Sequence, residues 1–414
     1  MCPFLKSGGM AFFNLNHSEE KRMKKFANFV VFAAMMAVLL SLSSCAKEPK
    51  EKEPENTTQP ETQATPTTPA PVVTYTITIA DGITNGTVTA SKTSGIAEGE
   101  TITLTITPAT DYELDTISAG TDVTLNETGN TRTFAMPAAN VTVTATFKWK
   151  WVGTKNPTTA KVVGDIVFND GSAMPYADFD TLEKTAKDTK KISAIALIFY
   201  KGTSTNDTLG LRTLGVGLKH DKKSLQWCSN SANALNKNID TIQCAPTVDS
   251  GSTLSAFVVG ADKDGSDNLE QIAAFLSAEG SGTNDDTTGD QASSRYPAFY
   301  FAKNYKEQII GEETASRIPS GSEYENGWYL PSLAELYQIY ACRADRTNGY
   351  DIDIASAALG GDKFEKDWIY WSSSQDSSND DYACRLYFKN GVWYSTPKNY
   401  TTSYRSVCAI RAFN

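Results

Sequence analysis

The chain has very few of the side chains on which metal sites and nucleophilic catalysis depend. It contains two histidines in 414 residues, and only His220 lies beyond position 45. No two of its cysteines form a Cys-x-x-Cys pair, so a zinc site has almost no ligands to draw on. A serine or cysteine nucleophile needs a base, and His220 lies in a Lys-His-Asp-Lys-Lys run that is typical of a solvated surface. We therefore expect neither enzyme activity nor a bound cofactor.

The chain also lacks an excess of positive charge. Its 38 Lys and Arg residues against 48 Asp and Glu residues give a net charge of −10. A basic patch is the usual footprint of a protein that binds nucleic acid. We therefore expect no nucleic-acid partner.

Long hydrophobic runs are absent apart from one, Phe29 to Leu42. It is shorter than a typical membrane span and follows several basic residues at positions 21–25, which is the profile of a signal peptide. The run ends in Leu-Ser-Ser-Cys, which places Cys45 where a bacterial lipoprotein accepts its lipid. We predict that residues 1–45 are a signal peptide with a lipobox. Met23 offers an alternative start for the same signal.

The predicted lipidation at Cys45 determines the expected location of the protein. Acyl chains on this cysteine would hold the mature chain at the cell envelope, at the outer membrane and exposed on the surface. Residues 46–73 are rich in Pro, Thr, Glu and Lys and have almost no large apolar side chain to bury, which predicts a disordered tether. Such a tether would hold the folded part about 30 Å or further from the lipid.

Cysteine is also scarce in the predicted mature chain. Cys2 and Cys45 belong to the signal segment, and the remaining number is odd, so at least one thiol stays free or pairs between molecules. An exported protein can carry disulfides, but spacing alone does not establish them. Two pairings are left open, Cys228 with Cys244 and Cys384 with Cys408.

Residues 74–148 alternate between apolar and polar side chains, as in Val141-Thr-Val-Thr-Ala-Thr-Phe147, which predicts half-buried strands. Turn residues such as Asn85-Gly86 separate the alternating runs. The closing motif Phe134-Ala-Met-Pro-Ala-Ala-Asn-Val-Thr-Val resembles the divergent internalin-type B-repeat of bacterial surface proteins. The resemblance implies a small all-β, β-grasp-like stalk domain, and a single copy suggests a spacer.

Residues 151–414 combine strand and helix patterns, as expected for a chain long enough for two or three domains. The apolar run from Ile192 to Tyr200 predicts a buried central strand. Between Asn268 and Leu276 the apolar residues fall on one helical face. The Gly/Ser/Thr/Asp-rich stretch 279–294 is predicted to be an exposed loop.

Several motifs of this last unit occur in a recognisable order. Trp328-Tyr-Leu-Pro-Ser-Leu-Ala-Glu-Leu contains a capping box, in which Ser332 and Glu335 begin a helix. Tyr370-Trp-Ser-Ser-Ser, a Lys-Asn-Gly turn at 389–391 and a terminal Ile-Arg-Ala-Phe follow. Together they resemble C-type-lectin-like domains of collagen-like adhesins and of the formylglycine-generating-enzyme branch. The closest resemblance is to variable lipoproteins of diversity-generating retroelements, of the treponemal variable-protein type.

The resemblance implies a multidomain protein, with the all-β repeat followed by an α+β, C-type-lectin-like domain that binds a ligand without chemistry. Two stretches of this domain, 372–383 and 394–404, are rich in Ser, Asn, Asp and Tyr, the composition of antibody paratopes. Composition alone fits solvated turns equally well, and the resemblance favours binding because this segment is the family's varied region. The predicted ligand-binding residues are Asp376, Ser378, Asn379, Asp380, Tyr382, Arg385, Tyr387, Trp393, Tyr394, Ser395, Asn399, Tyr400, Thr402 and Tyr404.

The binding hypothesis makes a structural expectation. Hot spots in protein interfaces are mostly aromatic residues or arginines, and the alternation from Tyr382 to Phe388 indicates a strand whose outward side chains include Arg385. The aromatic candidates should therefore be accessible and lie in one patch, whereas Trp328 and Trp371 should lie in the core. The expected patch consists of Tyr382, Tyr387, Trp393, Tyr394 and Tyr400.

Other functions stay open as alternatives. The ligand is a protein or glycan outside the cell, and a fixed-specificity adhesin or envelope structural protein is the second hypothesis. A formylglycine-generating type of enzyme is a distant third, because no match to its catalytic cysteine region is present and fold does not imply function. Calcium is the one metal left open, at Asp262-Lys-Asp-Gly-Ser-Asp267, whose glycine comes too early for an EF-hand. A template repeat and reverse transcriptase gene in the neighbouring DNA would separate the first two hypotheses.

Overall fold

The structure is a computed structural model of the chain. The predicted signal peptide, Cys45 and the tether up to residue 71 lie outside the residues that it describes. Within its described part, no helix has both the length and the apolar character needed to cross a membrane. The described residues are 72–221, 223–280, 284–309, 311–312, 315–343, 350–364, 367–401 and 405–413.

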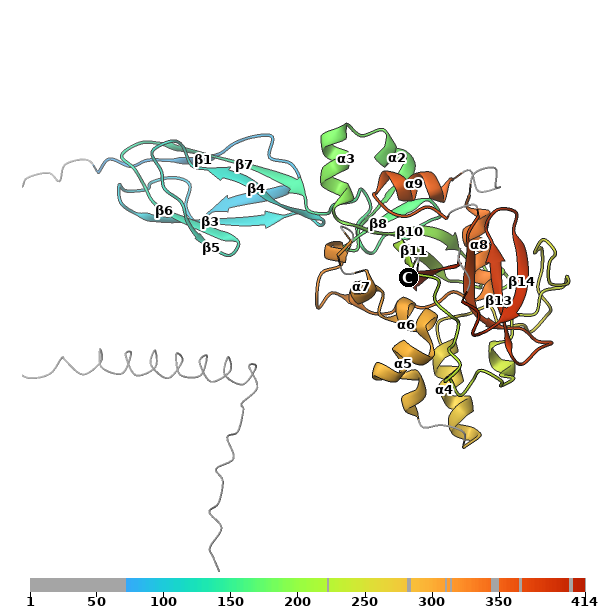
Figure 1. The fold of residues 1–414 in the computed structure, drawn as a ribbon. Helices are drawn as coiled ribbons and strands as arrows, with labels where there is room; N and C mark the ends of the chain where they lie inside the picture. Colours follow the sequence, from blue (N-terminus) through green and yellow to red (C-terminus); the bar gives the residue numbers. More distant parts are fainter. Residues whose placement is uncertain are drawn as a thin grey trace, which may run out of the picture. The chain divides into compact units, whose positions relative to one another are not determined.

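The repeat, residues 72–150, is built from strands (Figure 1). Two small sheets share one core, a three-stranded sheet in the order β1-β7-β4 and a four-stranded sheet in the order β2-β3-β6-β5. No helix occurs between residues 72 and 150, so the observed arrangement is a two-sheet sandwich, where a β-grasp fold would combine a sheet with a helix. The strands are β1 (Ile77–Ile79), β2 (Gly86–Ala90), β3 (Thr101–Pro108), β4 (Tyr112–Ser118), β5 (Asn126–Thr128), β6 (Thr131–Ala135) and β7 (Val141–Trp149).

The predicted alternation of the repeat is confirmed. In β7 every second side chain from Val141 to Phe147 is buried, and β3 shows the same period. The turn residue Gly86 is needed for packing as well as for the turn. A side-chain carbon at Gly86 would lie 2.5 Å from the ring of Phe147, so this ring packs directly on the backbone of β2.

The C-terminal domain is organised around one eight-stranded sheet in the order β14-β13-β12-β15-β11-β10-β8-β9. The predicted central strand is confirmed as β10, in which every residue except Lys201 is buried. Strands β12 and β15 pair in parallel, and the other neighbouring pairs are antiparallel. The strands are β8 (Asp165–Phe168), β9 (Ala173–Pro175), β10 (Ala194–Lys201), β11 (Thr213–Asp221), β12 (Ile369–Gln375), β13 (Tyr382–Tyr387), β14 (Val392–Pro397) and β15 (Arg405–Ala412).

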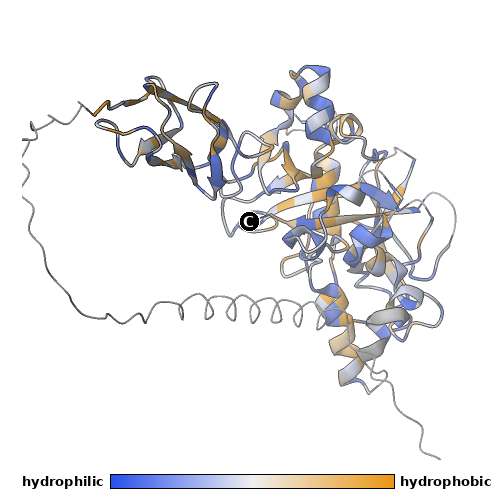
Figure 2. Ribbon diagram, turned by 90° about the vertical axis from the view of Figure 1, so that its left-hand side faces the viewer, coloured by the Kyte–Doolittle hydropathy of each residue, from blue (hydrophilic) through white to orange (hydrophobic). Residues whose placement is uncertain are grey.

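Helices cover both faces of this sheet, and apolar residues concentrate between the layers (Figure 2). Helices α8 and α9 pack on one face, and α4, α6 and α7 pack on the other. The α-helices are α2 (Tyr176–Asp180), α3 (Lys184–Lys191), α4 (Asn268–Ala278), α5 (Gly289–Arg295), α6 (Pro297–Lys303), α7 (Tyr305–Gln308), α8 (Leu333–Ala341) and α9 (Ile352–Ala358). Short 3₁₀ turns are η1 (Asp240–Ile242), η2 (Asn284–Thr287), η3 (Ala315–Arg317) and η4 (Glu323–Glu325).

The prediction of an exposed loop at 279–294 is wrong. Its described part contains η2 and most of α5, and Asp286 is 2% exposed. The hydroxyl of Tyr296 donates to Asp286 at 2.6 Å, and Arg295 forms an ion pair with the same carboxylate. The polar composition therefore reflects a buried carboxylate with partners as well as solvated side chains.

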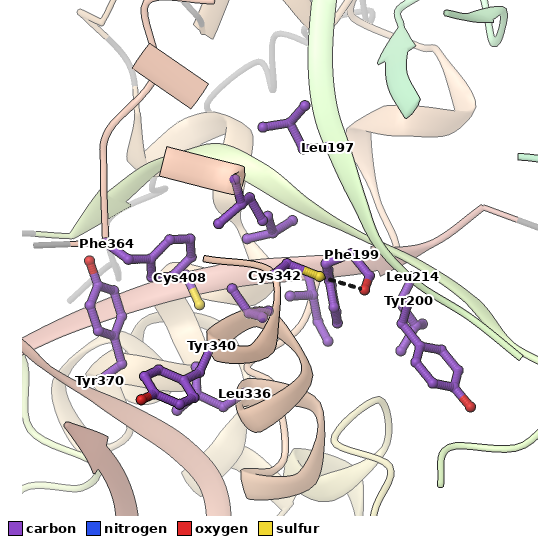
Figure 3. Close-up of a cluster of buried hydrophobic side chains, with 14 of the residues drawn as sticks. Leu197, Phe199, Tyr200, Leu214, Leu336, Tyr340, Cys342, Phe364, Tyr370 and Cys408 are labelled. Carbon is purple, nitrogen blue, oxygen red and sulfur yellow. Dashed lines mark hydrogen bonds between the residues drawn. The ribbon is translucent and has the colours of Figure 1, made fainter. Parts of the chain in front are cut away.

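The cysteines of the C-terminal domain fill space in the core. All five are buried free thiols, so neither of the two disulfide pairings left open by the sequence is present. Cys342 follows α8, and its Sγ donates to the carbonyl of Phe199 at 3.2 Å (Figure 3). Around it, Leu336 and Tyr340 of α8 pack against the sheet, as buried thiols and apolar side chains commonly do together.

The capping box at the start of α8 is confirmed. The backbone N–H of Glu335 donates to Ser332 Oγ at 3.2 Å, and the backbone N–H of Ser332 donates to Glu335 Oε2 at 2.7 Å. The same buried carboxylate accepts from Arg212, from the Tyr329 hydroxyl and from the backbone N–H of Gly265. One side chain thus joins the helix start to three other segments.

Replacing Ser332 by alanine removes the acceptor for an otherwise unpaired N–H. We expect Ser332→Ala to lower the free energy of unfolding by about 0.5–2 kcal/mol. Ser322→Ala is the matched control, because Ser322 precedes η4 without accepting a capping hydrogen bond. Denaturant titration of both variants measures the difference. Equal stability of the two variants would show that the Ser332 cap contributes nothing.

Candidate ligand-binding face

Strand pairing brings two arginines onto one face of the sheet. Arg385 of β13 lies opposite Trp371 of β12 and opposite Tyr394 of β14. Arg405 of β15 lies opposite Ile369 of β12. Because side chains alternate along a strand, Ile369 and Trp371 point to the same side. Arg405 therefore shares a face with Arg385, although the two residues lie on strands separated by β12.

Aromatic rings line both guanidinium groups. The guanidinium carbon of Arg405 lies 4.0 Å from the ring centroid of Tyr400 and 5.8 Å from that of Trp371. The guanidinium carbon of Arg385 lies 5.3 Å from the ring centroid of Tyr394. These distances are within the range of cation–π attraction. We call Trp371, Arg385, Tyr394, Tyr400 and Arg405 the arginine–aromatic face.

Arg405 is buried and Arg385 is half-buried, and no carboxylate among the described residues compensates their charge. Arg405 is 4% exposed, and burial together with the positive charge of Arg385 lowers its pKa to about 10. Burial also lowers the pKa of Arg385. For both groups, none of the neighbours that perturb the pKa is a carboxylate. Within the described residues, Arg385 Nη1 and Arg405 Nε and Nη1 have no hydrogen-bond partner.

The expected aromatic patch is only partly present. Tyr394 is half-buried on the arginine–aromatic face, Tyr387 is half-buried on the same side of β13, and Tyr400 is 39% exposed. Trp393 is a correction, because it is 6% exposed and its indole N–H donates to the carbonyl of Val248 at 3.1 Å. Tyr382 also lies outside the expected patch.

Strand alternation explains both corrections. Trp393 lies opposite Leu386, and both point into the core beneath α8. Tyr382, four residues before Leu386 on β13, points to the same side and therefore away from Arg385. The five aromatic candidates are accordingly divided between the two faces of the sheet.

The candidates at the tip of the β12–β13 hairpin have different roles. Asp376 is buried and accepts hydrogen bonds from the backbone N–H and the hydroxyl of Ser378, both at 2.8 Å. Asp376 therefore closes the turn, and its predicted ligand-binding role stays a prediction. Ser378, Asn379 and Asp380 are exposed and are available to a partner.

The remaining candidates lie along β14 and beyond it. Ser395 is half-buried, and its N–H donates to Ser250 Oγ at 2.9 Å. Asn399 is half-buried, and its amide donates to Asn230 Oδ1 at 2.6 Å. Thr402 and Tyr404 lie outside the described residues.

The serine run of the first predicted binding stretch is structural. Ser372 to Gln375 belong to β12 and are fully buried. Ser373 Oγ accepts from the Asn268 amide at 2.8 Å, and Ser374 Oγ accepts from the backbone N–H of Leu333 at 2.9 Å. These hydroxyls connect β12 to the starts of α4 and α8, so a paratope-like composition marks an internal network here. The predicted core positions of Trp328 and Trp371 are confirmed at 2% and 0% exposure.

His220 is buried, which contradicts its predicted position on a solvated surface. It lies near the end of β11 at 7% exposure, with Nδ1 at 3.0 Å from the Tyr370 hydroxyl and its ring 4.3 Å from that of Phe364. The charged neighbours along the chain suggested a solvated side chain, but the strand turns the imidazole toward an aromatic cluster.

The acidic run left open for calcium is engaged internally. Asp262 accepts from the backbone N–H of Asp264 and from the Asn268 amide, both at 3.0 Å, and Asp264 pairs with Arg212 at 2.6 Å. Among the residues that the structure describes, no group of three or more His, Cys, Asp or Glu side chains is arranged to hold a metal ion.

Sequence reasoning missed Arg405 and a hollow beside the C-terminal end of β15. Arg405 escaped because nothing in the sequence shows that its strand pairs in parallel with β12. The hollow has a volume of about 440 Å³ and is bordered by α4, α6 and Arg411. Its charged side chains already have partners, since Lys303 pairs with Glu270 and Arg411 donates to three backbone carbonyls. On the arginine–aromatic face, in contrast, Arg385 Nη1 and Arg405 Nε and Nη1 are buried without a hydrogen-bond partner among the described residues.

Comparison with known proteins supports the assignment of the repeat. Residues 75–150 match the family of the divergent InlB B-repeat domain, in agreement with the predicted boundaries. No curated protein matches the chain significantly. A solved structure of a fimbrial protein from Bacteroides ovatus is similar with a TM-score of 0.38 and 13% identity, over 82% of this chain and 69% of that one. The C-type-lectin-like assignment of residues 151–414 stays a prediction.

The division of the aromatic candidates between two faces has a consequence for stability. Trp393→Ala should lower the free energy of unfolding by about 3–5 kcal/mol, because it empties part of the core beneath α8. Tyr400→Ala, at an exposed ring, should cost about 1 kcal/mol or less. Thermal or denaturant unfolding of the two variants measures this difference in stability. Similar losses for the two variants would contradict the assignment of Trp393 to the core.

Proposed function

We propose that this chain is a lipid-anchored protein of the cell envelope that binds a protein ligand through the arginine–aromatic face and acts without chemistry. The observation that carries the proposal is the gathering of Arg385, Tyr394, Tyr400 and Arg405 on one side of four adjacent strands. Arginine and tyrosine contribute most binding energy in protein interfaces, and a sheet holds them on rigid elements. The exposed tip residues Ser378 to Asp380 extend the polar surface beside them.

The remaining parts of the chain fit a display function. The matched B-repeat would serve as a stalk, and the predicted tether and lipid at Cys45 would attach it to the outer membrane. In this arrangement the C-terminal domain faces outward and meets its ligand outside the cell. The repeat fits a surface protein with either a fixed or a varied binding site.

Diversification by a retroelement is a finer form of the same proposal. It requires variable positions that tolerate substitution, and Ser377 to Asp381 are exposed. The buried serines of β12 would not tolerate variation, since each fills a position between packed elements. A template repeat should therefore match the codons of 372–375 without adenine-directed changes and differ at those of 377–381, 394 and 400.

Binding through this face predicts different effects for two tyrosines of similar exposure. A protein array probed with the mature chain identifies a target protein. Tyr394→Ala should weaken binding to this target by roughly tenfold or more. Tyr382→Ala is the matched control, because its side chain points to the opposite side of the sheet, and it should leave binding within about twofold. Both variants should unfold near the wild-type temperature. Loss of binding in Tyr382→Ala alone would exclude the arginine–aromatic face as the site.

Lipid attachment is tested by the predicted acceptor itself. Cys45→Ser should leave the chain unprocessed or release it from the membrane fraction, because serine cannot accept the thioether-linked lipid. Detergent-phase partitioning and the mass of the processed chain are the measurements. Unchanged partitioning and processing would end the lipoprotein proposal while leaving the binding face untouched.

A further inference from the structure

We infer that Arg385 and Arg405 form a binding site for the carboxylate of an acidic side chain on the protein ligand. The inference rests on the proposed function, which it deepens by naming the chemistry that the face recognises. It is drawn from three features of the two arginines: their unpaired buried atoms, their aromatic surroundings and their mutual proximity.

The unpaired atoms are the strongest indication. Arg385 Nη1 and Arg405 Nε and Nη1 are buried N–H donors without a partner among the described residues. A buried donor left unpaired costs free energy, and buried polar groups in proteins nearly always have a partner. Arg405 is the stronger case, because the whole side chain is 4% exposed.

The aromatic contacts leave Arg385 Nη1 and Arg405 Nε and Nη1 free, while Tyr400 also forms a side-chain hydrogen bond with Arg405. Tyr400 and Trp371 contact the guanidinium of Arg405 through their rings, and Tyr394 contacts that of Arg385 in the same way. A ring that packs against the guanidinium plane fixes its orientation while the N–H groups at the edge stay available. Thr396 Oγ1 accepts from Arg385 Nε, which further orients this side chain.

The mutual proximity of the arginines selects an anion. Two like charges held close in a poorly solvated site repel each other, and the pKa of Arg405 is lowered first by burial and then by the charge of Arg385. An anion between them would relieve this repulsion and satisfy the free donors. A carboxylate fits best, because the guanidinium fork matches its two oxygens in bidentate geometry.

The surrounding residues favour a protein as the source of the carboxylate. Tyr387, Tyr394 and Tyr400 provide broad, amphipathic contact surface around the arginines, which is typical of surfaces that recognise proteins. An acidic glycan would present the same group and is therefore the alternative that the experiment must distinguish.

The test uses the mature chain carrying Cys45→Ser, with a synthetic acetylated peptide of four Gly-Glu repeats as probe. Isothermal titration should detect binding of this peptide and no binding of the matching Gly-Gln peptide. Arg385→Gln and Arg405→Gln should each weaken the affinity by roughly tenfold or more. Arg405→Lys keeps the positive charge but loses the forked geometry of the guanidinium. It should therefore recover only part of the affinity that Arg405→Gln loses.

Lys389→Gln is the control for charge loss. Lys389 lies at the turn between β13 and β14 with 58% of its side chain exposed, and its removal should change the affinity less than about twofold. The ligand-free Arg405→Gln variant should unfold at or above the wild-type temperature, because it removes an unpaired buried charge. A lower unfolding temperature would show that Arg405 has a purely structural role and would overturn the inference.

Other outcomes also decide the question. Wild-type affinity for the Gly-Glu peptide in both glutamine variants overturns the inference, and so does binding of the Gly-Gln peptide as tight as that of the Gly-Glu peptide. Binding of oligogalacturonate in place of the Gly-Glu peptide, with the same sensitivity to Arg385→Gln, overturns the assignment to a protein ligand. If Tyr394→Ala loses its array target while both glutamine variants retain it, the carboxylate assignment fails and the proposed face stands. If none of these variants affects the array target, the proposed function fails as well.

Discussion

The parallel pairing of β12 with β15 is the contact on which the C-terminal domain depends. In the sheet order, this pair joins β12, β13 and β14 to the remaining five strands. Tyr370 and Trp371, adjacent on β12, point into the cores on opposite sides of the sheet, so the junction anchors both layers of helices at once. The pairing also requires the last strand of the chain to insert between β12 and β11, which makes the fold strongly non-local.

The same pairing creates the binding face. It places Arg405 on the side of the sheet that carries Arg385, and Tyr400 and Trp371 then enclose its guanidinium. Burying Arg405 beside the half-buried Arg385, without a described carboxylate, is costly for a folded chain. Perturbed and poorly compensated charges cluster at functional sites, and a ligand that supplies the missing negative charge gives a physical reason for keeping them. The hollow beside Arg411 lacks this feature because its charges are already paired.

Local sequence signals predicted the structure where the chain interacts with itself at short range. The alternation of β3 and β7, the apolar run of β10, the helix at Asn268 and the capping box of Ser332 depend on neighbouring residues, and the structure confirms each. The repeat boundaries were also predictable, because its closing motif is specific. The two-sheet arrangement was not, since the pairing of β1 with β7 joins strands more than sixty residues apart.

The candidate site was predictable only in part, because composition does not reveal which way a strand faces. Ser372 to Gln375 and Ser378 to Asp380 have similar composition, yet the former are buried in β12 and the latter are exposed at the hairpin tip. Trp393 and Tyr394 are consecutive, and their side chains point to opposite sides. His220 and Asp286 lie in polar runs and are nevertheless buried. Arg405 was missed because its place beside Arg385 follows from strand order, which tertiary packing decides.

A crystal structure of the mature chain with the Gly-Glu peptide tests the central claim most directly. The account predicts a glutamate carboxylate between the two arginines, with its oxygens about 2.7–3.2 Å from Arg385 Nη1 and from Arg405 Nε or Nη1. The rings of Tyr394 and Tyr400 should border the bound peptide. A peptide bound elsewhere, or a carboxylate of the chain itself paired with both arginines, would contradict it.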